Sequence, residues 1–305
     1  MGKLRINKGR WQEAIAFYLF LLPWIIGFTS MTLGPMIVSI WYSLTDYNML
    51  MPPWFVGLEN YQRLFTEDPL FWKSLYNTVY YVIFSVPLGL VAGLILALLL
   101  NQKLRGMNLF RTIYYLPSIV PMIAGSFLWV WIFNPRYGLL NRLLGMIGLP
   151  DNILWLHSEV WSKPALIIMS LWGVGGGMII FLAGLQGIPV QLYEAAQLDG
   201  ASKWSQFWKV TLPLLTPTIF FNLIMGLIGA FQTFAQVYVM TGGQGGPLNS
   251  TLFYMLYLYR QAFEFFNMGY ASAMAWVLFV IVIALTLLQL KLSKRWVFYQ
   301  GDARG

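Results

Sequence analysis

Six apolar stretches, each about 20 residues long or more, limit what this chain can fold into. A helix needs about 20 apolar residues to cross the hydrocarbon core of a bilayer, which is about 30 Å thick. Because lipid offers no water to backbone N–H and C=O groups, each stretch must satisfy these groups internally as a helix. We therefore expect an all-α, polytopic membrane protein with six transmembrane helices, at residues 14–41, 75–100, 112–133, 164–185, 214–240 and 271–290.

The first stretch is too long for a cleavable signal peptide, whose apolar region has about 7–15 residues. We expect a retained helix that is broken or kinked near Pro23 and at Gly34-Pro35. The expected organisation is an N-terminal segment at 1–13, a transmembrane domain at 14–290 with a polar loop at 187–213, and a tail at 291–305.

Lysine and arginine are distributed unevenly between the segments that connect the stretches. The N-terminus, the second and fourth connections and the tail carry 13 of the 19, although the other three connections are longer together. By the positive-inside rule, both termini and the polar loop are cytoplasmic. The 13 residues are Lys3, Arg5, Lys8, Arg10, Lys103, Arg105, Arg111, Lys203, Lys209, Lys291, Lys294, Arg295 and Arg304.

The composition argues against several classes of function. The chain is 58% hydrophobic and only 10% charged, and its net charge of +8 lies beside apolar runs, so we expect membrane lipid rather than nucleic acid as a partner. With no cysteine and a single histidine, we expect no metal site and no cofactor, and we place His157 in a solvated loop. No nucleophile has a base beside it, so we expect no catalytic residues and no enzyme activity.

The six stretches contain no Asp, Glu, Lys, Arg or His. A proton-coupled carrier would need ionisable groups there, whereas sodium coupling can use carbonyls and hydroxyls and is only disfavoured. No G-x-x-x-x-G-K-[ST] loop is present either, so the chain is not expected to hydrolyse ATP by itself. Energy for uphill transport would have to come from another polypeptide, and a self-contained secondary carrier or channel is the alternative.

The polar segment 194–217 is predicted to form two short helices. Pro189 suits the first turn of the first helix, and Gly200 can end it with a positive φ. Ser202 can cap the second helix, which we expect to end at Leu212-Pro213, before the fifth span.

The second predicted helix is amphipathic. Trp204, Phe207 and Trp208 would share one face, with Ser205, Gln206 and Lys209 pointing away from it. A helix that lies on lipid headgroups would show the same pattern, so this remains an alternative to a surface for protein contact.

The polar segment resembles the EAA loop of membrane subunits of ATP-binding-cassette (ABC) importers. The matching residues are Glu194-Ala195-Ala196, Asp199-Gly200-Ala201, Phe207, Val210, Leu212-Pro213 and Pro217. The likeness covers nearly the whole chain and is greatest to the carbohydrate-importing branch, in particular the first permease of maltose, lactose or glycerol-phosphate systems. The other matching motifs are at 55–61, Asn77-Thr78, Arg111, Leu116-Pro117, Asn134-Pro135, 137–141 and Thr241-Gly242-Gly243.

The resemblance implies a permease subunit of an ATP-driven, binding-protein-dependent sugar importer in the plasma membrane of a prokaryote. Its implied partners are a second homologous six-helix permease, two cytoplasmic ABC ATPase subunits and an extracytoplasmic sugar-binding protein. An importer of a non-sugar solute is the alternative. The loop at 242–247 reads GGQGGP and departs from the family's Gly-Gly-Gly-Pro run. The residues implied to couple the chain to the ATPase are Glu194, Ala195, Ala196, Asp199, Gly200, Leu212 and Pro213.

Sugars are recognised by hydrogen-bonding side chains and aromatic faces, and the fifth stretch carries both. Gln232 and Gln236 are spaced to share one helix face, with Phe231, Phe234 and Tyr238 nearby. Asn77, in the second stretch, is a further candidate, and so are Tyr80 and Tyr81. These residues are predicted to line a substrate pathway for a neutral oligosaccharide; helix-to-helix hydrogen bonding and plain packing are the alternative.

Overall fold

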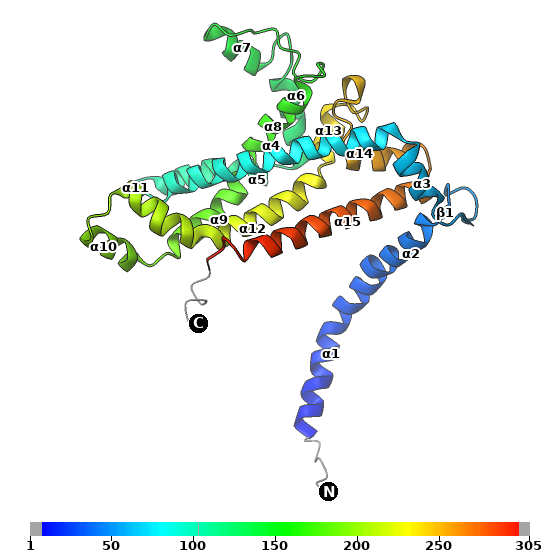
Figure 1. Ribbon diagram of the computed structural model, residues 1–305, viewed down its shortest axis with the longest axis horizontal. Helices are drawn as coiled ribbons and strands as arrows, with labels where there is room; N and C mark the ends of the chain where they lie inside the picture. The colour runs from blue at the N-terminus through cyan, green and yellow to red at the C-terminus, as the bar shows by residue number, and fades with distance from the viewer. Residues whose placement is uncertain (1–7, 103, 299–305) are drawn as a thin grey trace. The chain divides into compact units, whose positions relative to one another are not determined.

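The computed structural model describes residues 8–102 and 104–298, which are mostly helical (Figure 1). The chain divides into two compact units. The first ends at Glu67 and includes Arg260–Val277, and the second comprises Asp68–Tyr259 and resumes at Leu278. Four of the basic residues that predict the orientation, Lys3, Arg5, Lys103 and Arg304, lie outside the described residues. The elements are α1 (Lys8–Phe28), α2 (Gly34–Ser43), β1 (Thr45–Asp46), β2 (Trp54–Phe55), α3 (Glu59–Thr66), α4 (Pro69–Leu100), α5 (Met107–Ile119), α6 (Met122–Ile132), α7 (Leu139–Met146), α8 (Ser162–Trp172), α9 (Gly175–Gln186), α10 (Val190–Leu198), α11 (Lys203–Gln206), α12 (Leu212–Phe231), α13 (Ala235–Met240), α14 (Tyr254–Tyr259) and α15 (Met268–Ser293), with π-turns at Thr29–Leu33, Phe207–Thr211 and Arg260–Glu264 and a short 3-10 turn at Pro247–Asn249.

The described part of the chain has enough apolar helix for six membrane crossings. Four continuous helices are long and apolar enough to span a bilayer: Glu13–Ser43, Pro69–Leu100, Lys203–Phe231 and Met268–Ser293. Two bent pairs, α5 with α6 and α8 with α9, raise the number to six if each pair is one span. The expectation of a helical, polytopic membrane protein is confirmed, with one two-residue strand pair, β1 and β2, as the exception.

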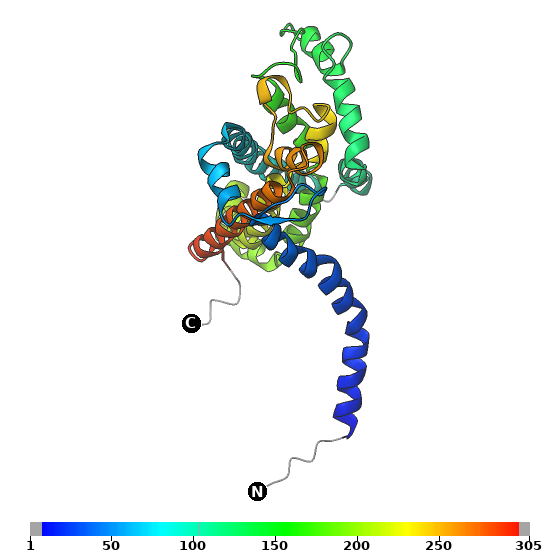
Figure 2. The same ribbon diagram turned by 90° about the vertical axis from the view of Figure 1, so that its right-hand side faces the viewer.

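The first span is not broken, contrary to one of the two predicted possibilities. Pro23 lies inside α1, and the helix passes into α2 through the π-turn Thr29–Leu33, directly before Gly34-Pro35. Figure 2 shows α1 and α2 as one curved rod. A local π adjustment can satisfy the backbone groups that a proline leaves free, which is why prolines are tolerated in membrane helices.

The rest of the first unit is held together by polar contacts around the β1–β2 hairpin. The Asn60 amide donates to the carbonyls of Ser43 and Thr45, at 3.0 and 2.9 Å, and Tyr61 donates to the Ser43 hydroxyl at 2.8 Å. The backbone N–H of Gly269 donates to the carbonyl of Tyr47 at 3.0 Å. Two residues of the 55–61 motif, Asn60 and Tyr61, therefore fasten this hairpin to the end of α2.

The second unit is built around α4, which packs against α8, α9 and α12 (Figure 1). Ala97, Met178, Phe181 and Leu215 from three of these helices form a fully buried cluster. Small residues permit the close approach, since a Cβ at Gly184 would lie 2.6 Å from the Thr218 hydroxyl on α12. This is the pattern of membrane helix packing, in which small residues let backbones come together.

The third and fourth stretches are bent. Helices α5 and α6 meet at 98° and helices α8 and α9 at 46°. The first break falls at Val120-Pro121, where both residues are extended, because a proline disfavours the helical conformation in the residue before it. The second falls at Gly173-Val174. Apolar length predicted both stretches but carries no information on a bend.

The fifth stretch begins earlier and ends earlier than predicted. The helix is continuous from Lys203 to Phe231, and residues 232–234 then separate it from the short helix α13. The predicted helix at 214–240 is therefore wrong at both ends, since the polar segment before it joins the span and a break interrupts its last third.

Candidate functional site

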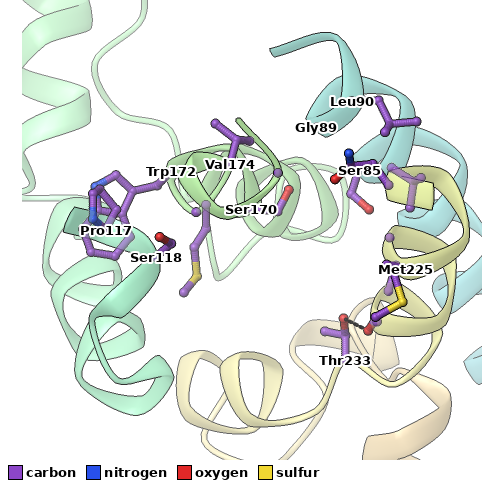
Figure 3. A pocket seen from close by; sticks show the side chains of 18 of the residues that line it. Ser85, Gly89, Leu90, Pro117, Ser118, Ser170, Trp172, Val174, Met225 and Thr233 are labelled. Atoms are coloured by element: carbon purple, nitrogen blue, oxygen red, sulfur yellow. Dashed lines mark hydrogen bonds between the residues drawn. The ribbon is translucent and has the colours of Figure 1, made fainter. Parts of the chain in front are cut away.

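A cavity of about 530 Å³ lies within the second unit (Figure 3). Residues of α4, α5, α6, α8, α9 and α12 line it, together with the segment that leads into α13. All three helix breaks of this unit border the cavity, since Val120, Gly173, Val174 and Thr233 are among its lining residues. Irregular backbone at membrane depth is tolerated where it is buried in protein or lines a water-filled cavity. The bends and the cavity therefore belong to one feature.

The cavity wall is mostly apolar, and its seven polar side chains carry no charge. Its polar groups are hydroxyls, amides and one phenol, and Trp172 adds an aromatic face (Figure 3). Gln236 donates to the Tyr81 hydroxyl at 3.3 Å, and the Ser85 hydroxyl is buried without a partner in the described structure. Such a wall suits an uncharged solute that carries many hydroxyl groups. The polar lining residues are Tyr81, Ser85, Ser118, Ser170, Asn222, Thr233 and Gln236.

Of the eight residues predicted for the pathway, Tyr81 and Gln236 line this cavity and the other six do not. Gln232 ends α12 and is exposed, so the prediction that it shares one helix face with Gln236 is wrong; the break at 232–234 separates them. Phe231 is buried. Phe234 and Tyr238 instead form an aromatic cluster with Tyr259, at centroid distances of 4.9 and 5.4 Å from it.

Asn77, a further candidate, is fully buried and anchors a loop. Its amide donates to the carbonyls of Asn249 and Leu252, at 2.8 and 3.1 Å. Both carbonyls belong to the glycine-rich loop after α13, in which Leu248 and Asn249 have positive φ of 50° and 56°. The amide thus holds a strained loop in place.

Asn77→Ala should destabilise the protein by about 1–3 kcal/mol, because it leaves buried carbonyl groups without donors. The midpoint of thermal unfolding in detergent measures this. Asn101→Ala is the matched control at the exposed end of the same helix and should change the free energy of unfolding by about 0.5 kcal/mol or less. Equal midpoints for the two variants would contradict the anchoring role.

The sequence singled out Tyr81 and Gln236 but missed the smaller polar residues of the cavity wall. Ser85, Ser170 and Thr233 are isolated polar residues within apolar stretches, which is a weak signal, because a hydroxyl can always bond to its own helix. Only the packing of separate stretches brings them together around one space. His157, by contrast, is exposed in a loop as expected.

The first of the two helices predicted at the polar segment 194–217 is present in the structure. Helix α10 runs over Val190–Leu198, with Pro189 as its cap residue rather than in its first turn. Gly200 has the predicted positive φ, 76°. The Ser202 hydroxyl accepts from the backbone N–H of Ser205 at 3.3 Å, so the predicted cap of the second helix is confirmed.

The second predicted helix is not a separate element, because it continues into α12 through the π-turn Phe207–Thr211. The backbone N–H of Leu212 donates to the carbonyl of Phe207, five residues earlier. Pro213 falls in the first turn of α12. The π-turn before it accommodates the backbone groups that this proline leaves free, so the helix continues and the predicted stop at Leu212-Pro213 is wrong.

The aromatic face of this helix is open. Trp204 is 70% and Trp208 is 49% exposed, and their rings lie 5.6 Å apart. Gln206 does point away from them, but it is buried, and it donates to the carbonyl of Ala201 at 3.0 Å.

Most of the residues implied to couple the chain to an ATPase are accessible. Glu194, Ala195, Asp199 and Gly200 are exposed, and Ala196 is half-buried. No other described residue forms an ion pair with Glu194. Leu212 and Pro213 are half-buried in the first turn of α12. Helix α10 therefore presents a small, acidic surface next to the start of a membrane span.

Known proteins share both the sequence and this architecture. The chain is 45% identical to the probable ABC transporter permease protein YesP of Bacillus subtilis (strain 168), over 95% of this chain and 94% of the relative. It is 40% identical to the lactose transport system permease protein LacF of Rhizobium radiobacter, over 89% and 92% of the two chains. A crystal structure of a bacterial alginate ABC transporter, in complex with alginate pentasaccharide-bound periplasmic protein, superposes with a TM-score of 0.81 at 25% identity, over 93% and 96% of the chains.

Residues 89–297 match the family described as binding-protein-dependent transport system inner membrane component. This range covers more than half of the chain and includes α10 and the cavity wall except for Tyr81, Ser85 and Val86. The protein is thus a multi-pass, non-catalytic permease subunit, and its ATPase is a separate subunit. Together with the identity to ABC permeases over nearly its full length, the match means that this chain belongs to the family of binding-protein-dependent transport system inner membrane components.

Proposed function

We propose that this permease forms one half of the translocation pathway of an ATP-driven importer of neutral oligosaccharides. The observation that carries this proposal is the cavity wall, in which hydroxyls, amides and an aromatic ring occur without a charged residue. Relatives named for the transport of lactose, of trehalose and maltose, and of starch degradation products support the sugar class. A neutral sugar offers the hydroxyls that such a wall can bind and carries no charge to desolvate.

The proposed complex contains four kinds of chain. A second six-helix permease would complete the pathway, two cytoplasmic ABC ATPases would supply the energy, and an extracytoplasmic binding protein would deliver the sugar. The similar alginate transporter was solved in complex with a sugar-bound periplasmic protein, which supports the last of these partners. The absence of a phosphate-binding loop from this sequence supports the separate ATPases.

In this proposal both termini and α10 are cytoplasmic. The excess of lysine and arginine in the segments that share this side supports the orientation, and the exposed surface of α10 supports its role as the element that docks on an ATPase. Movement of α10 would then reach the cavity through α12, which runs from the polar segment to the break at 232–234.

Uptake by the complete complex tests the proposal. The complex, purified through a tag on this chain and placed in proteoliposomes with its binding protein, should accumulate at least one of labelled lactose, trehalose or maltotriose only when ATP is supplied. Accumulation without ATP, or of none of these sugars, would contradict the proposed function.

Gly89→Phe should block the pathway, because a Cβ at Gly89 meets no atom within 4 Å and a ring there would extend into the cavity. We expect uptake to fall at least about tenfold, which corresponds to ~1.4 kcal/mol of added barrier, with the chain folded and assembled. Leu88→Phe adds a ring at the neighbouring position, whose side chain is 45% exposed, and should leave uptake unchanged. Equal uptake by both variants would place the pathway elsewhere.

A further inference from the structure

Tyr193 lies on α10 next to Glu194 but is half-buried where Glu194 is exposed. Its ring packs against a buried cluster that includes Leu185, Ile188 and Leu215. Its hydroxyl lies 2.9 Å from the Thr211 hydroxyl, which belongs to the π-turn that leads into α12. The side chain therefore joins the proposed docking helix to the membrane span directly, across 18 residues of sequence.

Two hydrogen-bonding contacts surround Thr211. Its hydroxyl lies 2.9 Å from the Tyr193 hydroxyl, where either group can donate, and 3.4 Å from the carbonyl of Gln206. The Gln206 amide donates in turn to the carbonyl of Ala201, in the turn between the helices, at 3.0 Å. Thr211 and Gln206 are both buried, so water competes little for these bonds.

The π-turn brings Thr211 to this position. A π-turn holds one residue more than an α-helical turn, and one extra residue rotates all later side chains by about 100° around the helix axis. In a regular α-helix Thr211 would therefore face another direction. The same turn keeps α11 and α12 continuous, so a force on Thr211 acts on the whole span.

We propose that Tyr193, Thr211 and Gln206 form a latch, and that Tyr193 is a positioning residue that transmits movement of α10 to α12. The inference rests on the proposed function, in which α10 docks on an ATPase. The turn at 199–202, where Gly200 has a positive φ, also joins α10 to the helix that continues into α12. A single turn can flex, and the latch would hold α10 and α12 at a fixed angle to each other.

The test is the number of ATP molecules hydrolysed per sugar accumulated by the complete complex in proteoliposomes, with the labelled sugar that the wild type accumulates. Tyr193→Phe keeps the ring and removes its hydroxyl, and Thr211→Val keeps the shape and removes the hydroxyl that it contacts. Each should raise the ratio about fivefold, the effect of one lost hydrogen bond, and the double variant should be no worse than either single variant. Thr211→Ser should restore the wild-type ratio.

Thr112→Val is the matched control, since the Thr112 hydroxyl donates only to a carbonyl of its own helix, that of Asn108, at 3.0 Å. If Tyr193→Phe leaves the ratio of ATP hydrolysed to sugar accumulated unchanged, or if the effects add in the double variant, the latch is overturned. The proposed function still stands in either case, provided that the wild-type complex accumulates the sugar with ATP. Loss of the co-purified ATPase from Tyr193→Phe would also overturn it, because the hydroxyl would then serve docking. A wild-type complex without ATP-driven uptake would overturn the proposed function and the latch with it.

Discussion

Glu194→Lys should abolish ATP-driven uptake while the chain still inserts and folds. Glu194 is exposed on α10 and forms no ion pair with another described residue, so its reversal breaks no internal contact. If α10 docks on an ATPase through this carboxylate, a lysine here would face the positively charged group that binds the carboxylate. Such a pair of like charges costs roughly 2–5 kcal/mol. The expected loss of ATPase affinity is then at least about thirtyfold. Uptake and the amount of ATPase that co-purifies with the tagged chain measure it.

Glu13→Lys is the control for this variant. It makes the same change of charge, also at an exposed position on the proposed cytoplasmic side, but outside the α10 loop. It should leave both uptake and the co-purified ATPase unchanged. Full uptake by Glu194→Lys would instead favour the alternative in which the polar segment lies on lipid headgroups.

Gly175→Ala should prevent α5 and α9 from packing against each other. Gly175 is buried at the start of α9, and a Cβ there would collide with the backbone carbonyl of Tyr114 and lie 2.9 Å from the Cα of Tyr115. Since both neighbours are backbone atoms, no side chain can rotate away. Overpacking of this kind costs about 3 kcal/mol, so we expect a large fall in the unfolding midpoint and in the yield of folded protein.

Gly176→Ala, one residue later, tests whether this effect is steric. A Cβ at Gly176 meets no atom within 4 Å, and alanine favours a helix over glycine by about 1 kcal/mol. This variant should be as stable as the wild type or more so. A similar loss in both variants would show that the run of glycines is needed for flexibility and that close packing is not the reason for Gly175.

Some local features followed directly from the sequence. The positive φ of Gly200 and the Ser202 cap depend on residues a few positions apart, so the sequence around them was sufficient. The C-terminal end of the second span was similarly well placed, because its apolar run stops at Leu100, where α4 ends, whereas α4 starts at Pro69, before the predicted residue 75. The site was harder to predict. Gln236 was found, but Gln232 was assigned to the same helix face because nothing local marks the break at 232–234.

The sequence by itself determined how many apolar segments this protein has and roughly where they lie, since burial in lipid depends on the length and composition of each segment alone. It also identified the EAA segment and its family. The tertiary structure alone decided that the polar segment continues into the fifth span through a π-turn and that Ser85, Ser170 and Gln236 border one cavity. These features arise from contacts between helices that are distant in sequence, such as the latch from Tyr193 to Thr211. The sequence pattern of one segment cannot predict these features, because each depends on the side chains of another segment that packs against it.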